Sequence, residues 1–237
     1  TAPEKECGKS LLLTLIGKLV ARPITSSNIS PAALFRAIDA WTPTLLIDEA
    51  DTFMRDNEEL RGLLNSGHTR DSAYVVRAVG ETFQPTKFST WGAKAISGIG
   101  HIADTLMSRA IVFELRRKLP HEKVDRLRQA EQYVFNDLRA KLARFADDCR
   151  EEVRLARPPL PQSLGDRQQD NWEPLLTIAM TAGNEWLSIG TTAALKISGS
   201  ESATHTIGTE LLSDIKEIFE EKQLERITMA ELVKALC

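Results

Sequence analysis

The sequence predicts an α/β fold with mostly parallel strands, followed by an all-helical unit. Two observations support this. In residues 1–117, short apolar runs of strand length alternate with helical stretches, a pattern typical of a parallel sheet covered by helices. From residue 119 to about residue 198, apolar residues recur at intervals of three or four, which indicates helices. We therefore expect a core over residues 1–118, a helical lid over 119–198, and a linker with the start of a C-terminal helical unit, of possible winged-helix type, over 199–237.

The elements of the core follow from local signals. Ser30 is a typical N-cap and Pro31 a typical first helical residue, so a helix begins there. Gly80 and Glu81 separate two strand-like runs, which predicts a hairpin. In order, the expected elements are helix 9–19, helix 32–40, strand 44–47, helix 58–64, hairpin strands 74–79 and 82–88, and strands 93–99 and 110–115.

The elements after residue 119 are expected to be helical. An apolar stripe runs from Val124 to Phe145, and Asp170-Asn171 is expected to start a helix over 172–182. A further helix is expected over 185–197, with Trp172 and Trp186 in the core of the lid. Thr228 to Glu231 has the pattern of a capping box that opens a last helix.

The composition of the chain excludes several classes of protein. The chain has 237 residues and a net charge of −3, which excludes a protein that is basic throughout but not a local basic site. The three cysteines are scattered, which argues against a zinc site or disulfide framework and favours a cytoplasmic protein. No apolar run is long enough for a membrane span. Because the chain starts without Met and ends inside a predicted helix, we expect a fragment of a longer protein.

The strongest motif is Gly8-Lys9-Ser10, followed by an apolar helix. A phosphate-binding loop needs inward backbone N–H groups, a lysine for the β- and γ-phosphates and a hydroxyl for Mg²⁺. The residues that this motif assigns to ATP are Glu4, Lys5, Glu6, Cys7, Gly8, Lys9, Ser10 and Leu11. The full pattern has Gly where this chain has Pro3, and the strand expected before the loop is absent from the sequence. Taken alone, the triplet is also compatible with a helix start that carries an exposed lysine.

A second motif is an apolar strand, residues 44–47, that ends in two acids. Asp48 at the strand end is expected to hold Mg²⁺ together with Ser10, and Glu49 to accept a proton from the attacking water. A solvated turn is the alternative interpretation of such a pair. The order of the two motifs in an α/β context favours a nucleoside triphosphate site.

Residues 3–10, 27–36 and 44–51 together resemble a family of P-loop ATPases of uncharacterised function. Members of that family occur in helicase-like and primase-associated proteins of phages, plasmids and bacterial mobile elements. Residues 64–68, 95–100, 104–109 and 166–172 are similar to it too, so the resemblance covers nearly the whole chain. The resemblance extends to AAA+ ATPases, which implies a P-loop NTPase core with a helical lid. It also implies that identical chains assemble into a ring, which we expect to be hexameric.

The AAA+ resemblance implies further site residues. Arg109 stands where the family places an arginine finger, which stabilises the γ-phosphate from the neighbouring subunit. Arg116 and Arg117 are rival candidates for this role. Ser97 is the candidate first sensor, although a clear Asn is missing there, and Arg167 is a candidate second sensor in the lid.

The resemblance also implies contact with DNA, which we expect to be single-stranded. Hairpins inserted at this point in helicase-like AAA+ proteins project into the central channel. The candidate phosphate contacts on or beside the predicted hairpin are His68, Arg70, Arg77 and Lys87. A solvated hairpin is the alternative interpretation.

These features together predict a Mg²⁺-dependent ATPase. The expected work is DNA unwinding or translocation in the replication of a mobile element or phage, an inference from the resemblance. A first alternative is an ATP-dependent loader or protein-remodelling switch without helicase activity. A second is a non-catalytic nucleotide-binding module, since Pro3 replaces the first Gly of the loop.

Overall fold

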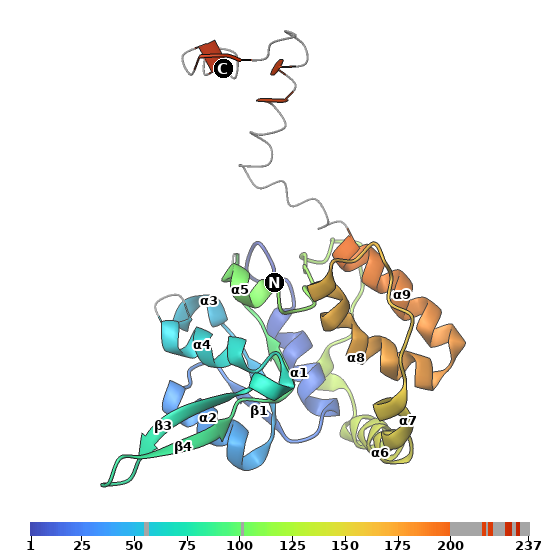
Figure 1. Ribbon diagram of the computed structural model, residues 1–237. Helices are drawn as coiled ribbons and strands as arrows, with labels where there is room; N and C mark the ends of the chain where they lie inside the picture. The colour runs from blue at the N-terminus through green and yellow to red at the C-terminus, as the bar shows by residue number, and fades with distance from the viewer. Residues whose placement is uncertain are drawn as a thin grey trace. The chain divides into compact units, whose positions relative to one another are not determined.

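The computed structural model describes residues 1–54, 57–100 and 102–199, together with residues 215, 216, 218, 219, 226–228, 231 and 232. The chain divides into two units, Thr1–Ser198 and Gly199–Cys237. The first unit is a mixed α/β structure with a small parallel sheet and several helices (Figure 1). Of the second unit, the described residues include the capping box, in which the Thr228 N–H donates to Glu231 Oε2 at 3.2 Å and the Glu231 N–H donates to Thr228 Oγ1 at 3.4 Å. These two bonds confirm the box, whereas the expected linker 199–208 lies, apart from Gly199, outside the described residues.

The parallel sheet has the strand order β1-β2-β5, formed by β1 (Pro23–Ser26), β2 (Thr44–Ile47) and β5 (Lys94–Ile96). In register, Leu45 is paired with Ile24 on one side and with Lys94 on the other. Leu45, Leu46 and Ile47 of this central strand are buried on both faces of the sheet, which explains its apolar run after Thr44. Its prediction as a buried strand is confirmed.

The helices of the core begin and end where local chemistry requires. They are α1 (Lys9–Leu19), α2 (Pro31–Trp41), α3 (Ala50–Phe53), α4 (Glu58–Ser66) and α5 (Asp104–Met107). The Ser30 side chain accepts a hydrogen bond from the Ala33 N–H at 3.3 Å, as expected of an N-cap. Asn57 caps α4 in the same way, at 2.9 Å from the Leu60 N–H. Apolar side chains of α2, β2 and α4, including Leu34, Ile47 and Leu60, form the main core.

The predicted strand over residues 110–115 is absent. This segment is extended and contacts the start of the chain: the Thr1 amino group donates to Phe113 O at 2.7 Å, and Leu115 N–H donates to Thr1 O at 2.9 Å. On the other side, Ala2 forms an isolated parallel bridge with Ile99. Residues 110–115 share only this short parallel pairing with Thr1, and the segment forms no strand of the sheet.

The predicted hairpin is confirmed, with a longer turn than expected. It follows a short 3-10 turn, η1 (Arg70–Ser72), and consists of β3 (Tyr74–Val79) and β4 (Gln84–Ser89), paired from Tyr74↔Ser89 to Val79↔Gln84. The turn takes up residues 80–83 because both Gly80 and Phe83 have positive φ, 74° and 51°. Figure 1 shows that the hairpin extends away from the helices, and Phe83 in its turn is 76% exposed.

The helical part of the first unit contains η2 (Leu127–Gln129), α6 (Gln132–Asp148), α7 (Arg150–Leu155), α8 (Asp166–Ala182) and α9 (Asn184–Ser198). The predicted stripe from Val124 is wrong before Gln132. The Glu122 carboxylate accepts the Leu119 N–H at 2.7 Å and pairs with Arg116, so the chain turns here instead of entering a helix. Helix α8 begins earlier than predicted, because the Gln168 side chain accepts the Gly165 N–H at 3.1 Å and caps the helix there.

A second, smaller core joins α8 to α9, which lie side by side in Figure 1. Trp172 is buried in it and donates from its indole nitrogen to Ser198 Oγ at 3.0 Å. This confirms Trp172 as a core residue. The same prediction is wrong for Trp186, which is 58% exposed, since only one face of the α9 helix packs against α8.

Lys94 in β5 gives the core a measurable pH dependence. Its ammonium donates to the carbonyl groups of Gly67, Thr90 and Gly92 at 3.4, 3.2 and 2.9 Å, and its burial lowers its pKa to about 8. An unfolded lysine keeps its ordinary pKa of about 10.4, so the unfolded chain binds more protons between these two values. The free energy of unfolding should therefore rise with pH in this window, by up to about 3 kcal/mol.

Urea unfolding of the wild type and of Lys94→Met at several pH values between 7 and 10.5 measures this contribution. The wild-type curve should rise relative to that of the variant, because methionine fills similar space without a titrating group. Parallel curves for the two proteins would contradict the assignment to Lys94.

Candidate functional site

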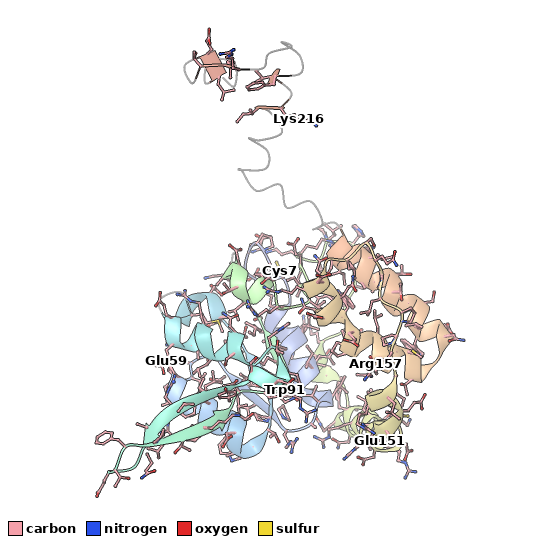
Figure 2. The ribbon with its side chains drawn as sticks, in the orientation of Figure 1. Cys7, Glu59, Trp91, Glu151, Arg157 and Lys216 are labelled. Atoms are coloured by element: carbon pink, nitrogen blue, oxygen red, sulfur yellow. The ribbon has the colours of Figure 1, made fainter. Side chains whose placement is uncertain are left out.

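The loop before α1 ends in a left-handed glycine. Gly8 caps α1 in the left-handed conformation, with φ of 84°, and a Cβ added there would meet nothing within 4 Å. Glycine is favoured at such a position, and the space before it is open. The Lys9 ammonium folds back and donates to Glu4 O at 2.9 Å. Cys7 is buried below the loop, with its thiol 3.7 Å from Lys5 O, and Figure 2 labels it near the start of the chain.

Asp48 brings the two sequence motifs together at the carboxyl end of β2. Its side chain accepts a hydrogen bond from the Ser97 hydroxyl, and the Ser10 side chain lies near enough to help lower its pKa. It also accepts the Glu49 N–H at 3.0 Å, and Lys9 lies close enough to act on its charge. Residues from three separate elements therefore meet around one carboxylate.

The pKa of Asp48 lies below its ordinary value. Partial burial acts in the opposite direction, but the hydrogen bonds from Ser10, Ser97 and the Glu49 backbone, with the positive charge of Lys9, outweigh it. Asp48 is therefore ionised at neutral pH. A hydroxyl oxygen beside an ionised carboxylate is a donor set that Mg²⁺ accepts, since this ion prefers oxygen ligands and commonly uses one or two carboxylates.

Glu49 is held in an exposed position next to this cluster. Its backbone is left-handed, with φ of 54°, and the following Ala50 N–H is fixed to Ser97 O at 2.9 Å. Among the described residues, no hydrogen bond to the Glu49 carboxylate is present. This carboxylate can therefore accept a proton from a molecule bound beside Asp48.

Asp51 is a site residue that the sequence analysis did not assign. Its Oδ1 accepts the Ile99 N–H at 2.8 Å and lies against Gly98, where a Cβ would come within 3.1 Å of the same oxygen. Asp51 thus ties α3 to the turn that carries Ser97. A third acid within four residues, after Asp48 and Glu49, was the available signal.

The three candidate finger arginines have different surroundings. Arg109, at the end of α5, donates to the carbonyl of Thr105 at 2.7 Å. Arg116 forms a bidentate ion pair with Glu122, in which one terminal nitrogen lies 2.9 Å from Glu122 Oε2. Arg117 lies against the loop before α1, where its Nε donates to Lys5 O at 2.9 Å.

The first turns of α8 contact the segment that carries Arg109. Arg167 donates to Ser108 Oγ at 3.4 Å, and Asn171 Nδ2 donates to Ser108 O at 3.2 Å. Asn171 Oδ1 lies 2.9 Å from His68 Nε2, and since this amide oxygen can only accept, His68 carries a proton on Nε2. His68 therefore takes part in the junction between α4 and α8, so it lies apart from the hairpin strands with which it was grouped.

The remaining candidate nucleic-acid residues fall into two places. Arg77, in the middle of strand β3, pairs with Glu59 of α4 at 2.8 Å (Glu59 is labelled in Figure 2), so its guanidinium is already engaged. Arg70 and Lys87 line an open cavity of about 330 Å³ together with Tyr74, and the Lys87 ammonium lies 3.7 Å from the centre of the Tyr74 ring. Asp39 and Asp71 line the same cavity, so its two cations face two carboxylates beside an aromatic ring.

In the part of the chain that the structure describes, no cluster of three or more His, Cys, Asp or Glu side chains is arranged to hold a metal ion. Within the same residues, no helix is both long and apolar enough to cross a membrane.

Fold and site together define a mixed α/β protein with a loop, a serine and a carboxylate gathered at the end of its central strand. The family "Protein of unknown function (DUF3631)" matches residues 114–237, just over half of the chain. The chain belongs to this family. The match covers the helical part and the C-terminal unit, whereas the loop, Asp48 and Ser97 lie before it. No curated protein matches the chain.

Proposed function

We propose that the protein is a Mg²⁺-dependent P-loop ATPase with an AAA+-like core and a helical lid. The observation that carries this proposal is the meeting of Lys9 and Ser10 with Asp48 and Ser97 at the end of β2. Two motifs almost forty residues apart in the sequence supply complementary groups to one place: cations and backbone N–H groups for phosphate, and oxygen ligands for a cation.

The arrangement of the chain around the loop supports the same proposal. The strand order β1-β2-β5 continues through Ala2, beside Ile99, to the extended residues 113–115 beside Thr1. The loop thus leaves the sheet between β5 and residues 113–115 and runs directly into α1. Phosphate-binding loops lie between a parallel strand and the N-terminus of a helix, where the helix dipole favours an anion.

In this proposal each residue of the site has a chemical task. Lys9 and the N–H groups of residues 4–11 bind the β- and γ-phosphates, while Ser10 and Asp48 hold Mg²⁺. Bound there, Mg²⁺ supplies positive charge that offsets the charge developing on the phosphate oxygens. Glu49 takes the proton of the water that attacks the γ-phosphorus.

Ser97, fixed by Asp48, would sense the γ-phosphate, and Arg167 would do so from α8. Arg109 is proposed to act on the nucleotide of a neighbouring copy in a ring of identical chains, which we propose to be hexameric. Within its own chain, Arg109 donates to the Thr105 carbonyl. The finger role of Arg109 is therefore tested on the assembled ring, where a neighbouring copy is present.

The proposed output is movement on single-stranded DNA. The extended hairpin, with Arg70, Lys87 and Tyr74 at its base and the exposed Phe83 in its turn, supports such contact. Added salt lowers the affinity of a protein for DNA, and the decrease is steeper when the protein neutralises more phosphates.

The function is tested by measuring ATP hydrolysis with and without single-stranded DNA, beside DNA binding by Arg70→Ala/Lys87→Ala at several salt concentrations. We expect DNA to stimulate hydrolysis, and the double variant to bind DNA about tenfold more weakly with a flatter salt dependence. Arg144→Ala/Lys141→Ala, on α6, is the control with the same change of charge.

The outcomes separate the proposed activities. Hydrolysis that DNA leaves unchanged would favour a loader or protein-remodelling switch. An unchanged salt slope in the double variant would remove these two residues from the DNA contact. ATP binding without any hydrolysis would favour a non-catalytic nucleotide-binding module.

A further inference from the structure

Arg117 touches three consecutive residues of the phosphate loop. Its Nε donates to Lys5 O at 2.9 Å and lies 3.3 Å from Glu4 Oε1, and one terminal nitrogen lies 3.8 Å from Glu6 Oε2. These contacts connect residues 112 positions apart in the sequence. The Arg117 side chain is 48% exposed, so it lies at the rim of the loop and not inside the core.

The backbone explains why residue 117 is the one that reaches the loop. Thr1 hydrogen-bonds to Phe113 O and Leu115 N–H in the pattern of a parallel pair, so the two segments run in the same direction. Two residues further along, Arg117 stands beside the loop. Side chains alternate along an extended chain, and the neighbouring Arg116 accordingly turns away to Glu122.

The contact of Arg117 with the loop changes the charge that an approaching anion meets. Residues 4–10 carry two carboxylates, Glu4 and Glu6, and two ammonium groups, Lys5 and Lys9, so by themselves they are neutral. A nucleoside triphosphate approaching this loop would be repelled by the two carboxylates. Arg117 pairs with both of them and makes the local balance positive.

The backbone of the loop is also unfavourable at Glu6, so a contact that holds it there stabilises the loop. Glu6 has a φ of 64°, a left-handed conformation that favours glycine over residues with a side chain. Its carboxylate and the preceding Lys5 carbonyl are both contacted by the Arg117 guanidinium. A planar guanidinium can hold a carbonyl and a carboxylate at once, which a lysine cannot do with the same geometry.

We propose that Arg117 is a positioning residue of the phosphate loop, acting within its own chain: it holds the Lys5 carbonyl and neutralises Glu4 and Glu6, so that a nucleoside triphosphate can bind. This inference rests on the proposed ATPase function and assigns Arg117 a role other than that of a finger reaching into a neighbouring copy. A finger must be available to a second chain, whereas these contacts engage Arg117 with its own loop.

The test compares Kd for a fluorescent ATP analogue with Mg²⁺ in the wild type, Arg117→Ala and Arg117→Lys. Arg117→Ala should weaken binding about five- to tenfold, and Arg117→Lys should recover part of this loss through its charge. In a Glu4→Gln/Glu6→Gln background the effect of Arg117→Ala should shrink to about twofold or less, because the carboxylates it neutralises are gone. Arg144→Ala, an exposed ion-paired arginine on α6, is the matched control.

Two outcomes would overturn the proposal. Unchanged affinity in Arg117→Ala would show that the contact does not matter for binding. An equally large loss in the Glu4→Gln/Glu6→Gln background would show that Arg117 meets the nucleotide directly instead of positioning the loop.

A second measurement separates this proposal from the ATPase function itself. Hydrogen exchange of the amides of residues 4–9, recorded without nucleotide, should be faster in Arg117→Ala than in the wild type and unchanged in Arg144→Ala. If the wild type binds no nucleotide but this difference appears, the ATPase proposal fails and the positioning role stands. If nucleotide binds and the loop amides exchange equally in both proteins, the positioning role alone fails.

Discussion

The variant Glu49→Gln is expected to bind MgATP with nearly the wild-type Kd and to hydrolyse it at least about 100-fold more slowly. The reason is chemical: the amide keeps the shape of the carboxylate but cannot accept the proton of the attacking water, and loss of a general base costs about 10²- to 10⁴-fold in rate. Because glutamine is isosteric, the left-handed turn at this residue and the Ala50–Ser97 hydrogen bond should persist. Steady-state phosphate release and a separate binding titration measure the two quantities.

The control for this prediction is Glu185→Gln, which makes the same change in the first turn of α9, at an exposed position. It should hydrolyse ATP at the wild-type rate. Wild-type hydrolysis by Glu49→Gln would mean that another group accepts the proton, and would remove Glu49 from the reaction.

The variant Lys9→Ala is expected to weaken MgATP binding about 10- to 100-fold. A hydrogen bond from an ammonium group to a phosphate is charge-assisted, and losing one costs about 1.5–3 kcal/mol. The Lys9 ammonium donates to Glu4 O at 2.9 Å, so it already lies against the loop whose space beside Gly8 is open. Isothermal titration with a non-hydrolysable ATP analogue gives the affinity.

A second readout of Lys9→Ala follows from Asp48. The charge of Lys9 is one of the causes that keep the pKa of Asp48 low, so this pKa should rise when the lysine is removed. Lys196→Ala, at an exposed position on α9, should change neither quantity. An unchanged ATP affinity in Lys9→Ala would contradict the assignment of the loop to phosphate binding.

Much of the core of the site could be predicted from the sequence because its parts are short and local. A glycine that must be left-handed directly before a helix, and two acids directly after an apolar strand, are recognisable without tertiary information. The structure adds that these two motifs share hydrogen bonds around Asp48, and that Ser97 joins them. The ATPase activity itself stays a prediction until hydrolysis is measured.

Other site features could not be predicted, because they depend on which segments meet. The resemblance makes Arg117 a candidate finger, but its contacts with Glu4 and Lys5 arise because residues 113–115 lie beside Thr1. His68 was grouped with the hairpin by its position in the sequence, yet it hydrogen-bonds to Asn171, 103 residues away.

Local sequence signals set where most elements of the core begin and end, since caps, prolines and apolar periods act over a few residues. The Ser30–Pro31 helix start and the buried strand β2 are examples. Contacts between distant segments set the pairing of residues 113–115 with Thr1 and the exposure of Trp186. A strand needs a neighbour of sufficient length, and an apolar residue needs a surface to pack against. Both are supplied by distant parts of the chain, whose approach no local pattern encodes.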